Sequence, residues 1–406
     1  METSMSLRLT FAEKRLNSIA IINIGAAKAN TFSFVLNCGF SIHEITCNGR
    51  PALWKIDGEH QITTYISMAQ KVTITCSDII DKIVVKYSGS FPLATFEDIK
   101  ANRLRDASTH NIISNDLIAL SYYSVWYPMV RSIDILDHEV IVNGCADYYI
   151  VNGVYNDTEK TWHYKGQDLP LYNIIAYKRD ILKTVKNPYI NIYFLNEQDT
   201  KNVEKSACYY KDVLDYYNGG LYPKIKIPKC DMACLMPVLT EGGAYVEDNG
   251  LMVTTVLPEN DFEIIQLNAH ETAHFWCTGA PGTWEDWLNE TAAEWSALMY
   301  ALDQENIDLF EHMLKRWDCL DVYRTFPPIK TKDGSRPDGV HFRGVALFYF
   351  IYKKYDKNAI RTILQTFVGL DNKKTGELLK HLRGKVDDSI PSMIERALTI
   401  KDYNLL

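Results

Sequence analysis

Short segments with alternating apolar and polar positions make up most of the first 200 residues. Four of them, rich in valine, isoleucine, threonine and tyrosine, span 18–24, 31–37, 71–76 and 82–88. Such segments predict β-strands, and the Asn48-Gly49 pair predicts a turn between two of them. Strands at this spacing, without helical segments between them, favour an antiparallel sandwich or saddle.

The pattern changes near residue 200, where apolar positions begin to recur at helical spacing. Residues 199–217 predict a helix, and a second strand-like block follows at 224–256. From residue 261 onward the pattern is helical almost to the end of the chain. Its last expected helices are 358–368, 374–383 and 391–400. We therefore expect a β-rich domain over 1–200 and a second domain over 201–406.

Composition and charge exclude several classes of protein. Apolar residues make up 47% of the chain and charged residues 23%, which is ordinary for a globular protein. The net charge of −8 shows no basic excess, so we expect no nucleic-acid partner. The first 20 residues lack the apolar core of a signal peptide, and no apolar run is long enough to span a bilayer. Nine scattered cysteines suit reduced thiols, and we therefore expect a cytoplasmic protein without a membrane partner.

A histidine motif supplies the first candidate chemistry. Residues 270–274 read His-Glu-Thr-Ala-His, and positions four apart on a helix share one face. His270 and His274 can therefore bind one metal ion, with Glu271 beside its open coordination position. Asn260, with a glutamate three residues later, is a typical helix start. Two histidines at this spacing are also found as plain core or surface residues, so the motif alone does not decide.

A second segment strengthens the metal interpretation. Residues 287–294 predict an alanine-rich helix that presents Glu290 as a third ligand. Two imidazoles and one carboxylate, with water in the fourth position, form a common catalytic zinc set. Glu294 lies one turn further along and can accept the ring N–H of a ligand histidine. Its alternatives are a solvated helix face or the role of zinc ligand itself. With zinc bound, Glu271 would take a proton from the attacking water and return it to the leaving amine.

These residues resemble the gluzincin zinc aminopeptidases, the family of membrane alanyl aminopeptidase and leukotriene hydrolase. In that family the histidine motif is followed by Trp-Leu-Asn-Glu, which stands here at 287–290. The segment 244–251 stands where the family has its amine-binding Gly-Ala-Met-Glu-Asn strand. The resemblance implies an all-β N-terminal sandwich or saddle domain and a thermolysin-like α+β catalytic domain.

The resemblance also implies how a peptide substrate is held. Glu247 would bind the free α-amine of the substrate, which places the cut one residue from the terminus. The strand containing Gly243, Ala244 and Tyr245 would pair with the substrate backbone. The alternative for Glu247 is an ordinary residue ahead of a turn.

Three features depart from the family pattern. Only 15 residues separate His274 from Glu290, where the family usually has about 18. His341, in His-Phe-Arg-Gly, stands where the family has the tyrosine of Tyr-x-Lys-Gly. It either donates a hydrogen bond to the developing oxyanion or is inert. The sequence also ends without the family's large helical C-terminal domain, so we expect an open site or one covered by a second copy of the chain.

We therefore predict a zinc-dependent metallopeptidase, an aminopeptidase that hydrolyses N-terminal residues from peptides. One alternative is an endopeptidase or a processing peptidase with a narrow substrate range. The other is a catalytically weak protein that binds peptides, for which the missing tyrosine is the main argument.

Overall fold

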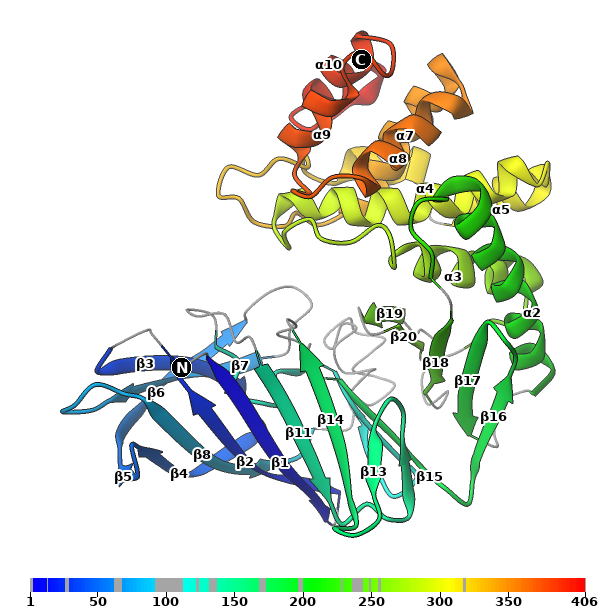
Figure 1. Ribbon diagram of the computed structural model, residues 1–406. Helices are drawn as coiled ribbons and strands as arrows, with labels where there is room; N and C mark the ends of the chain where they lie inside the picture. Colours follow the sequence, from blue (N-terminus) through cyan, green and yellow to red (C-terminus); the bar gives the residue numbers. More distant parts are fainter. Residues whose placement is uncertain are drawn as a thin grey trace.

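The computed structural model describes residues 3–12, 14–25, 29–61, 68–91, 112–121, 124–130, 137–167, 173–195, 200–227, 229–235, 244–247, 250–254, 257–316 and 319–405. In Figure 1 the strands of the first half form one body and the helices of the second half lie to one side of it. The strand-rich first part and the later helices are therefore as predicted. No helix among these residues is both long and apolar enough to cross a bilayer.

The largest sheet has eight strands, in the order β13-β14-β11-β1-β2-β8-β4-β5. All of its neighbouring pairs are antiparallel except β1 and β11, which run parallel. Burial alternates along β1, so that Met5, Leu7 and Leu9 face the core, as expected for a sheet with one solvated face. The strands are β1 (Ser4–Ala12), β2 (Arg15–Asn23), β4 (Phe40–Cys47), β5 (Arg50–Pro51), β8 (Lys82–Gly89), β11 (Asp137–Asn143), β13 (Val154–Asn156) and β14 (Thr161–Gln167).

Two smaller antiparallel sheets pack with this one. The first has the order β3-β7-β6 and the second the order β12-β15-β10-β9. One apolar core joins all three sheets, with Leu7 from the first, Phe34 from the second and Ile118 from the third. Their strands are β3 (Thr31–Asn37), β6 (Leu53–Gln61), β7 (Met68–Thr75), β9 (Ile112–Ile113), β10 (Leu117–Leu120), β12 (Tyr148–Ile150) and β15 (Ile174–Lys178).

A mixed five-stranded sheet connects the strands to the helices. Its order is β16-β17-β18-β20-β19, with β17, β18 and β20 parallel and both edge strands antiparallel. Helix α2 (Thr200–Tyr216) forms the crossover between β17 and β18 and packs against β17. The strands are β16 (Leu182–Lys186), β17 (Ile190–Leu195), β18 (Cys230–Cys234), β19 (Ala244–Glu247) and β20 (Leu251–Thr254).

Strand β10 explains how the two halves are held together. All four of its residues are buried, since alternate side chains enter two different cores. Ile118 and Leu120 belong to the core of the three N-terminal sheets. Leu117 and Ala119 belong to a second core, which includes Ala233 and other residues of the five-stranded sheet. Strands β16 and β17 already belong to the five-stranded sheet, so this sheet begins ahead of residue 200. The division of the chain into two domains at residue 200 stays a prediction.

The helical part is built around α4, whose residues are buried on all sides for most of its length. A helix that is apolar all round belongs inside a larger core, and α4 packs against α3, α5, α7 and α8. The helices are α3 (Asp261–Ala273), α4 (Trp287–Asp303), α5 (Ile307–Arg316), α6 (Cys319–Val322), α7 (Val340–Tyr355), α8 (Lys357–Val368), α9 (Thr375–Leu382) and α10 (Ser389–Ala397). Short helical turns are η3 (Tyr217–Leu221), η4 (Trp284–Asp286), η5 (Tyr323–Thr325) and η6 (Tyr403–Leu405).

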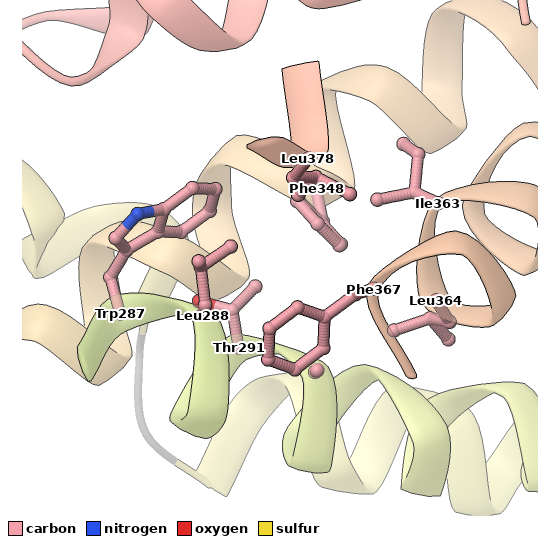
Figure 2. Close-up of a pocket in the computed structure, with 9 residues that line it drawn as sticks. Trp287, Leu288, Thr291, Phe348, Ile363, Leu364, Phe367 and Leu378 are labelled. Carbon is pink, nitrogen blue, oxygen red and sulfur yellow. The ribbon is translucent and has the colours of Figure 1, made fainter. Parts of the chain in front are cut away.

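A small apolar cavity lies within this helical core (Figure 2). Its volume of about 10 Å³ is too small for an organic ligand, so it is a packing gap. It is lined by Trp287, Leu288, Thr291, Ala292, Phe348, Ile363, Leu364, Phe367 and Leu378.

Candidate metal centre

Helix α3 carries both histidines of the motif on one face. Its start is fixed by Asn260, whose Oδ1 accepts hydrogen bonds from the backbone N–H groups of Phe262 at 2.8 Å and Glu263 at 3.4 Å. His270 lies in its last turn, and His274 follows directly after its last residue. The two Nε2 atoms are 3.3 Å apart. The two imidazoles therefore lie together, as the four-residue spacing of His270 and His274 predicts.

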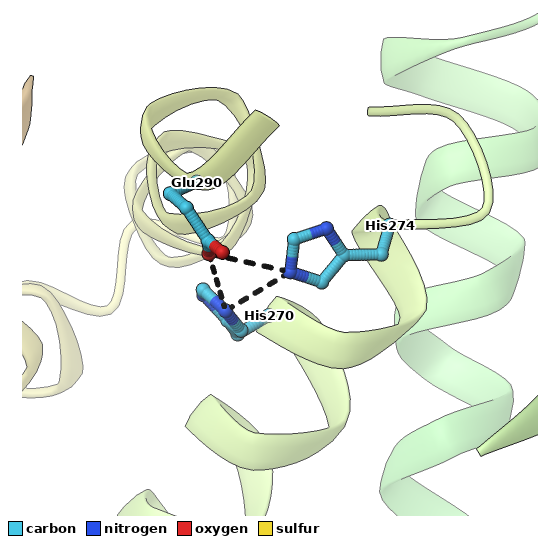
Figure 3. Close-up of side chains that lie close together, drawn as sticks. All are labelled: His270, His274 and Glu290. Atoms are coloured by element: carbon cyan, nitrogen blue, oxygen red, sulfur yellow. Dashed lines mark hydrogen bonds and ion pairs between the residues drawn. The ribbon is translucent and has the colours of Figure 1, made fainter. Parts of the chain in front are cut away.

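Helix α4 brings Glu290 to this pair (Figure 3). Its Oε2 lies 3.9 Å from His270 Nε2 and 3.6 Å from His274 Nε2. Four ligands around one zinc ion, at bond lengths of about 2.0–2.1 Å, are about 3.3 Å from one another. The three donor atoms thus have nearly the separations that a shared ion requires. The chemistry of the set, two imidazoles and a carboxylate, also suits zinc.

Glu294 supports the metal site from one turn further along α4. Its Oε2 is 2.7 Å from His270 Nδ1, and its Oε1 accepts a hydrogen bond from Gln266 at 3.1 Å. With Nδ1 engaged by a carboxylate, the Nε2 of His270 is the atom left for a metal. Gln266 was not foreseen, although its position one helical turn before His270 is a signal that could have indicated it.

The two histidines have opposite pKa shifts. Burial lowers the pKa of His270, but its contact with Glu294 and the charges of Glu271 and Glu290 outweigh burial and raise the pKa to about 9. Burial lowers the pKa of His274 to about 4, because the attraction of Glu290 offsets only part of the effect of burial. Burial alone would raise the pKa of Glu290, yet the cationic groups around it hold that pKa well below its ordinary value. The carboxylates and the imidazoles of this site therefore interact strongly with one another.

Glu271 lies on α3 between the two histidines and is buried, with 7% of its surface exposed. Its charge contributes to the raised pKa of His270. Glu271 is thus a buried carboxylate adjacent in sequence to His270. Its role as general base stays a prediction.

An arginine that sequence analysis did not identify also reaches the site. Arg336 lies on the loop before α7, and its Nη2 is 3.6 Å from Glu290 Oε1. Its Nε donates to Asp286 Oδ2 at 2.5 Å. No motif marks Arg336, because only the tertiary fold brings this loop to the start of α4.

Comparison with known proteins now places the fold. No family model matches the sequence, and no curated protein matches it either. Among solved structures, the chain is similar to an M1 zinc metallopeptidase from Deinococcus radiodurans, with 16% identity, a TM-score of 0.64, and 99% of this chain and 94% of that one covered. The chain has the fold of the M1 zinc metallopeptidases.

Two further structures agree with this assignment of the fold. One is a mutant of the Deinococcus enzyme bound to a Tyr-Ser-Ala substrate, with 16% identity, a TM-score of 0.65, and coverage of 99% of this chain and 94% of that one. The other is leukotriene A4 hydrolase from Saccharomyces cerevisiae, with 12% identity and a TM-score of 0.65. It is covered over 67% of its length, and this chain over 97%. The M1 fold thus agrees with the family resemblance of the sequence motifs.

Within this M1 fold, His341 lies at the rim of the metal site. It is the second residue of α7, and its Nδ1 is 3.5 Å from Glu290 Oε2. Its ring centroid is 6.4 Å from that of His270, and 44% of its side chain is exposed. The structure therefore brings His341 to the edge of the cluster formed by His270, His274 and Glu290. Its role in place of the family tyrosine stays a prediction.

The segment that the sequence analysis expects to pair with a substrate contains strand β19. It pairs antiparallel with β20, with Glu247 opposite Leu251 and Tyr245 opposite Val253, and it lies next to α3. Among the described strands it forms one edge of its sheet. Ala244 is its first residue, and Gly243 lies outside the described residues. The edge position suits backbone pairing with a peptide, while the roles of these four residues stay predictions.

Proposed function

We propose that this chain is a zinc-dependent metallopeptidase that removes N-terminal residues from peptides. The single observation that carries the proposal is the convergence of His270, His274 and Glu290 within 3.9 Å of one another on an M1 fold, with Glu294 fixing one of the histidines. The peptide complex of the similar Deinococcus enzyme supports a peptide as the class of substrate.

Each residue has a defined task in this proposal. His270, His274 and Glu290 would hold the zinc ion, which when bound supplies Lewis-acid polarisation of the scissile carbonyl and lowers the pKa of water. Glu271 accepts the proton of the attacking water and delivers it to the nitrogen of the leaving amine. His341 donates a hydrogen bond to the oxyanion that develops on the carbonyl oxygen.

The exopeptidase part of the proposal depends on β19. Glu247 would hold the α-ammonium group of the substrate by a charge-assisted hydrogen bond, so that only the first peptide bond reaches the metal. The edge of β19 would pair with the substrate backbone, which makes binding largely independent of the substrate side chains. A peptide substrate without a free α-amine would lose its contact with Glu247.

The test measures hydrolysis of aminoacyl-aminomethylcoumarin amides and N-acetylated peptides by the purified protein. We expect turnover of free-amine substrates only, lost on chelation and lowered by at least about 10²–10⁴-fold in Glu271→Gln. Glu263→Gln, on the same helix but away from the metal residues, is the matched control and should keep full activity. Bound zinc is measured in each sample, since Glu271→Gln should still hold one ion per chain.

Other outcomes separate the alternatives. Turnover of acetylated peptides would identify an endopeptidase and contradict the role of Glu247. Absence of turnover with zinc bound would favour a peptidase with a narrow substrate range or a peptide-binding protein. Activity that survives Glu271→Gln would overturn the mechanism.

A further inference from the structure

The two carboxylate oxygens of Glu290 face different partners. Oε2 lies 3.6 Å from His274 Nε2 and 3.9 Å from His270 Nε2, which is the side on which a metal would sit. Oε1 lies on the side of Arg336, 3.6 Å from its Nη2. A guanidinium directed at one oxygen makes the two oxygens unequal.

Arg336 is itself held in place by Asp286. Its Nε donates to Asp286 Oδ2 at 2.5 Å, and both side chains are only about one-seventh exposed, at 14% and 15%. Asp286 lies one helical turn before Glu290 and also accepts a hydrogen bond from Asn289 at 2.8 Å. One planar guanidinium therefore contacts two carboxylates four residues apart at the start of α4, through a hydrogen bond to Asp286 and an ion pair with Glu290.

The loop that carries Arg336 is ordered by its own contacts. Asp333 Oδ1 accepts the backbone N–H of Ser335 at 3.1 Å, and Thr331 Oγ1 donates to the Ser335 carbonyl at 2.6 Å. The Gly334 carbonyl accepts the N–H of Trp284, just ahead of α4, at 3.3 Å. A hydrogen bond therefore joins the loop that carries Arg336 to the segment just ahead of helix α4.

We infer that Arg336 is a positioning residue that engages Oε1 of Glu290, so that this carboxylate meets the metal through Oε2 alone. A carboxylate bound through both oxygens would take up a further coordination position, whereas a catalytic zinc must keep one open for water or substrate. This inference rests on the proposed function, because it requires a metal ion bound by the three donors. The competing interpretation is that Arg336 and Asp286 form an ion pair that only stabilises the fold.

The test is Arg336→Gln, which removes the charge and the forked donor. We expect its dissociation constant for zinc, measured by competition with a chromophoric chelator, to rise by about 10–100-fold. In the cobalt(II)-substituted protein we expect weaker visible absorption, because the coordination number rises when Oε1 also binds. The value of kcat should fall by a larger factor than KM rises, since the geometry of the metal changes rather than the substrate contacts.

Two variants make the result specific. Arg336→Lys keeps the charge but cannot span both carboxylates, and it should recover only part of the zinc affinity. Arg324→Gln removes an arginine whose partners are Tyr323 and Asp402, and it should leave the zinc affinity and the cobalt spectrum unchanged. Thermal unfolding of the metal-free proteins shows whether each variant is folded.

The outcomes are distinct from those of the proposed function. Wild-type zinc affinity and a wild-type cobalt spectrum in Arg336→Gln, with only a lower melting temperature, would overturn the inference and leave a structural ion pair. If the variant loses zinc affinity and changes the cobalt spectrum while the wild-type chain hydrolyses no peptide, the inference stands and the proposed peptidase function fails.

Discussion

Glu294 of helix α4 contacts two side chains of helix α3. Gln266 donates to one of its oxygens at 3.1 Å, and His270 Nδ1 lies 2.7 Å from the other. Burial raises the pKa of Glu294, but these hydrogen bonds and the charge of His270 outweigh burial and lower the pKa below its ordinary value. The carboxylate therefore stays ionised and fixes the orientation of the imidazole.

Replacing Glu294 with glutamine tests this orientation. The amide can present an N–H to Nδ1, which favours the tautomer with its proton on Nε2, the atom needed by the metal. We expect the dissociation constant for zinc to rise by about 10–100-fold, measured by chelator competition. Glu263→Gln on α3 serves as the control, and an unchanged constant in Glu294→Gln would mean that Glu294 only fills space.

The close approach of α4 and α7 depends on Gly344. A Cβ atom built at this position would lie 1.7 Å from Oγ1 and 2.9 Å from Cβ of Thr291, the residue after Glu290. Only a glycine therefore allows α7 to cross α4 at this separation. The spacing of the two helices sets the distance between Glu290 on α4 and His341 on α7.

Gly344→Ala should consequently lower the free energy of unfolding by about 1–3 kcal/mol, because overpacking must separate the helices. Urea titration followed by circular dichroism measures it. Thr291→Ala removes the atom in closest conflict, so the double variant Gly344→Ala/Thr291→Ala should be more stable than the sum of the single changes predicts. Strict additivity of the two changes would contradict the proposed contact.

Asp303 joins three helices at the other end of α4. It accepts a hydrogen bond from Tyr216 of α2 at 2.6 Å, and it pairs with Lys357 at 3.0 Å and with Arg361, both of α8. Burial raises its pKa, but these donors outweigh burial and hold the pKa below the ordinary value. A carboxylate with a lowered folded-state pKa adds stability above its unfolded pKa, and this stability is lost as the pH falls through the folded value.

Asp303→Asn should therefore reduce the free energy of unfolding at pH 7 by about 2 kcal/mol. The difference from the wild-type chain should shrink as the pH falls below about 4, where the carboxyl group becomes protonated in the unfolded chain and then in the folded one. Urea titrations at pH 7 and at acid pH measure both effects. Asp308→Asn, at an exposed position on α5, is the matched control. A difference that stays constant with pH would contradict the ionised role of Asp303.

Elements with local signals could be predicted from the sequence. Residues 199–217 correspond to α2, and the expected helix at 358–368 nearly coincides with α8. Asn260 caps α3 as its sequence position indicates, because capping involves only neighbouring residues. The sheet to which β16 and β17 belong was not predictable, because a strand has the same alternating pattern whichever partner it finds.

The same distinction applies to the candidate site. His270 and His274 are one turn apart, so their convergence follows from helix geometry alone. Glu290 and Glu294 were expected from a second local segment and from the family resemblance. Arg336 could not be found, since its approach to Glu290 depends on a loop whose path is set by tertiary contacts.

At the scale of the whole molecule, the chain covers nearly all of a two-domain M1 peptidase, 95% of that structure, while it covers 67% of yeast leukotriene A4 hydrolase. The expectation that a second copy covers the site stays a prediction. The three candidate metal ligands come from helix α3, the residue after it, and helix α4, so an ion bound to them would link the two helices and stabilise the fold.

Zinc binding should therefore raise the melting temperature. At a free zinc concentration of about 100 times the dissociation constant, the expected stabilisation is about 2.7 kcal/mol. Differential scanning fluorimetry of the chelated and zinc-loaded protein measures the shift. His274→Ala should show little or no shift under the same conditions, and an equal shift in this variant would place the stabilising ion elsewhere.

Helix α4 carries Glu290 in its first turn and Glu294 one turn later, with Asp286 directly before its first residue and Asp303 at its end. Because nearly every position between them is buried, a substitution there alters packing and metal geometry together. Helix α4 is thus a poor target for directed evolution of the substrate range. Most substitutions in it would also weaken metal binding, so a gain in activity on a new substrate would not be detected. Libraries directed at positions outside α4 should therefore retain a much larger fraction of active clones.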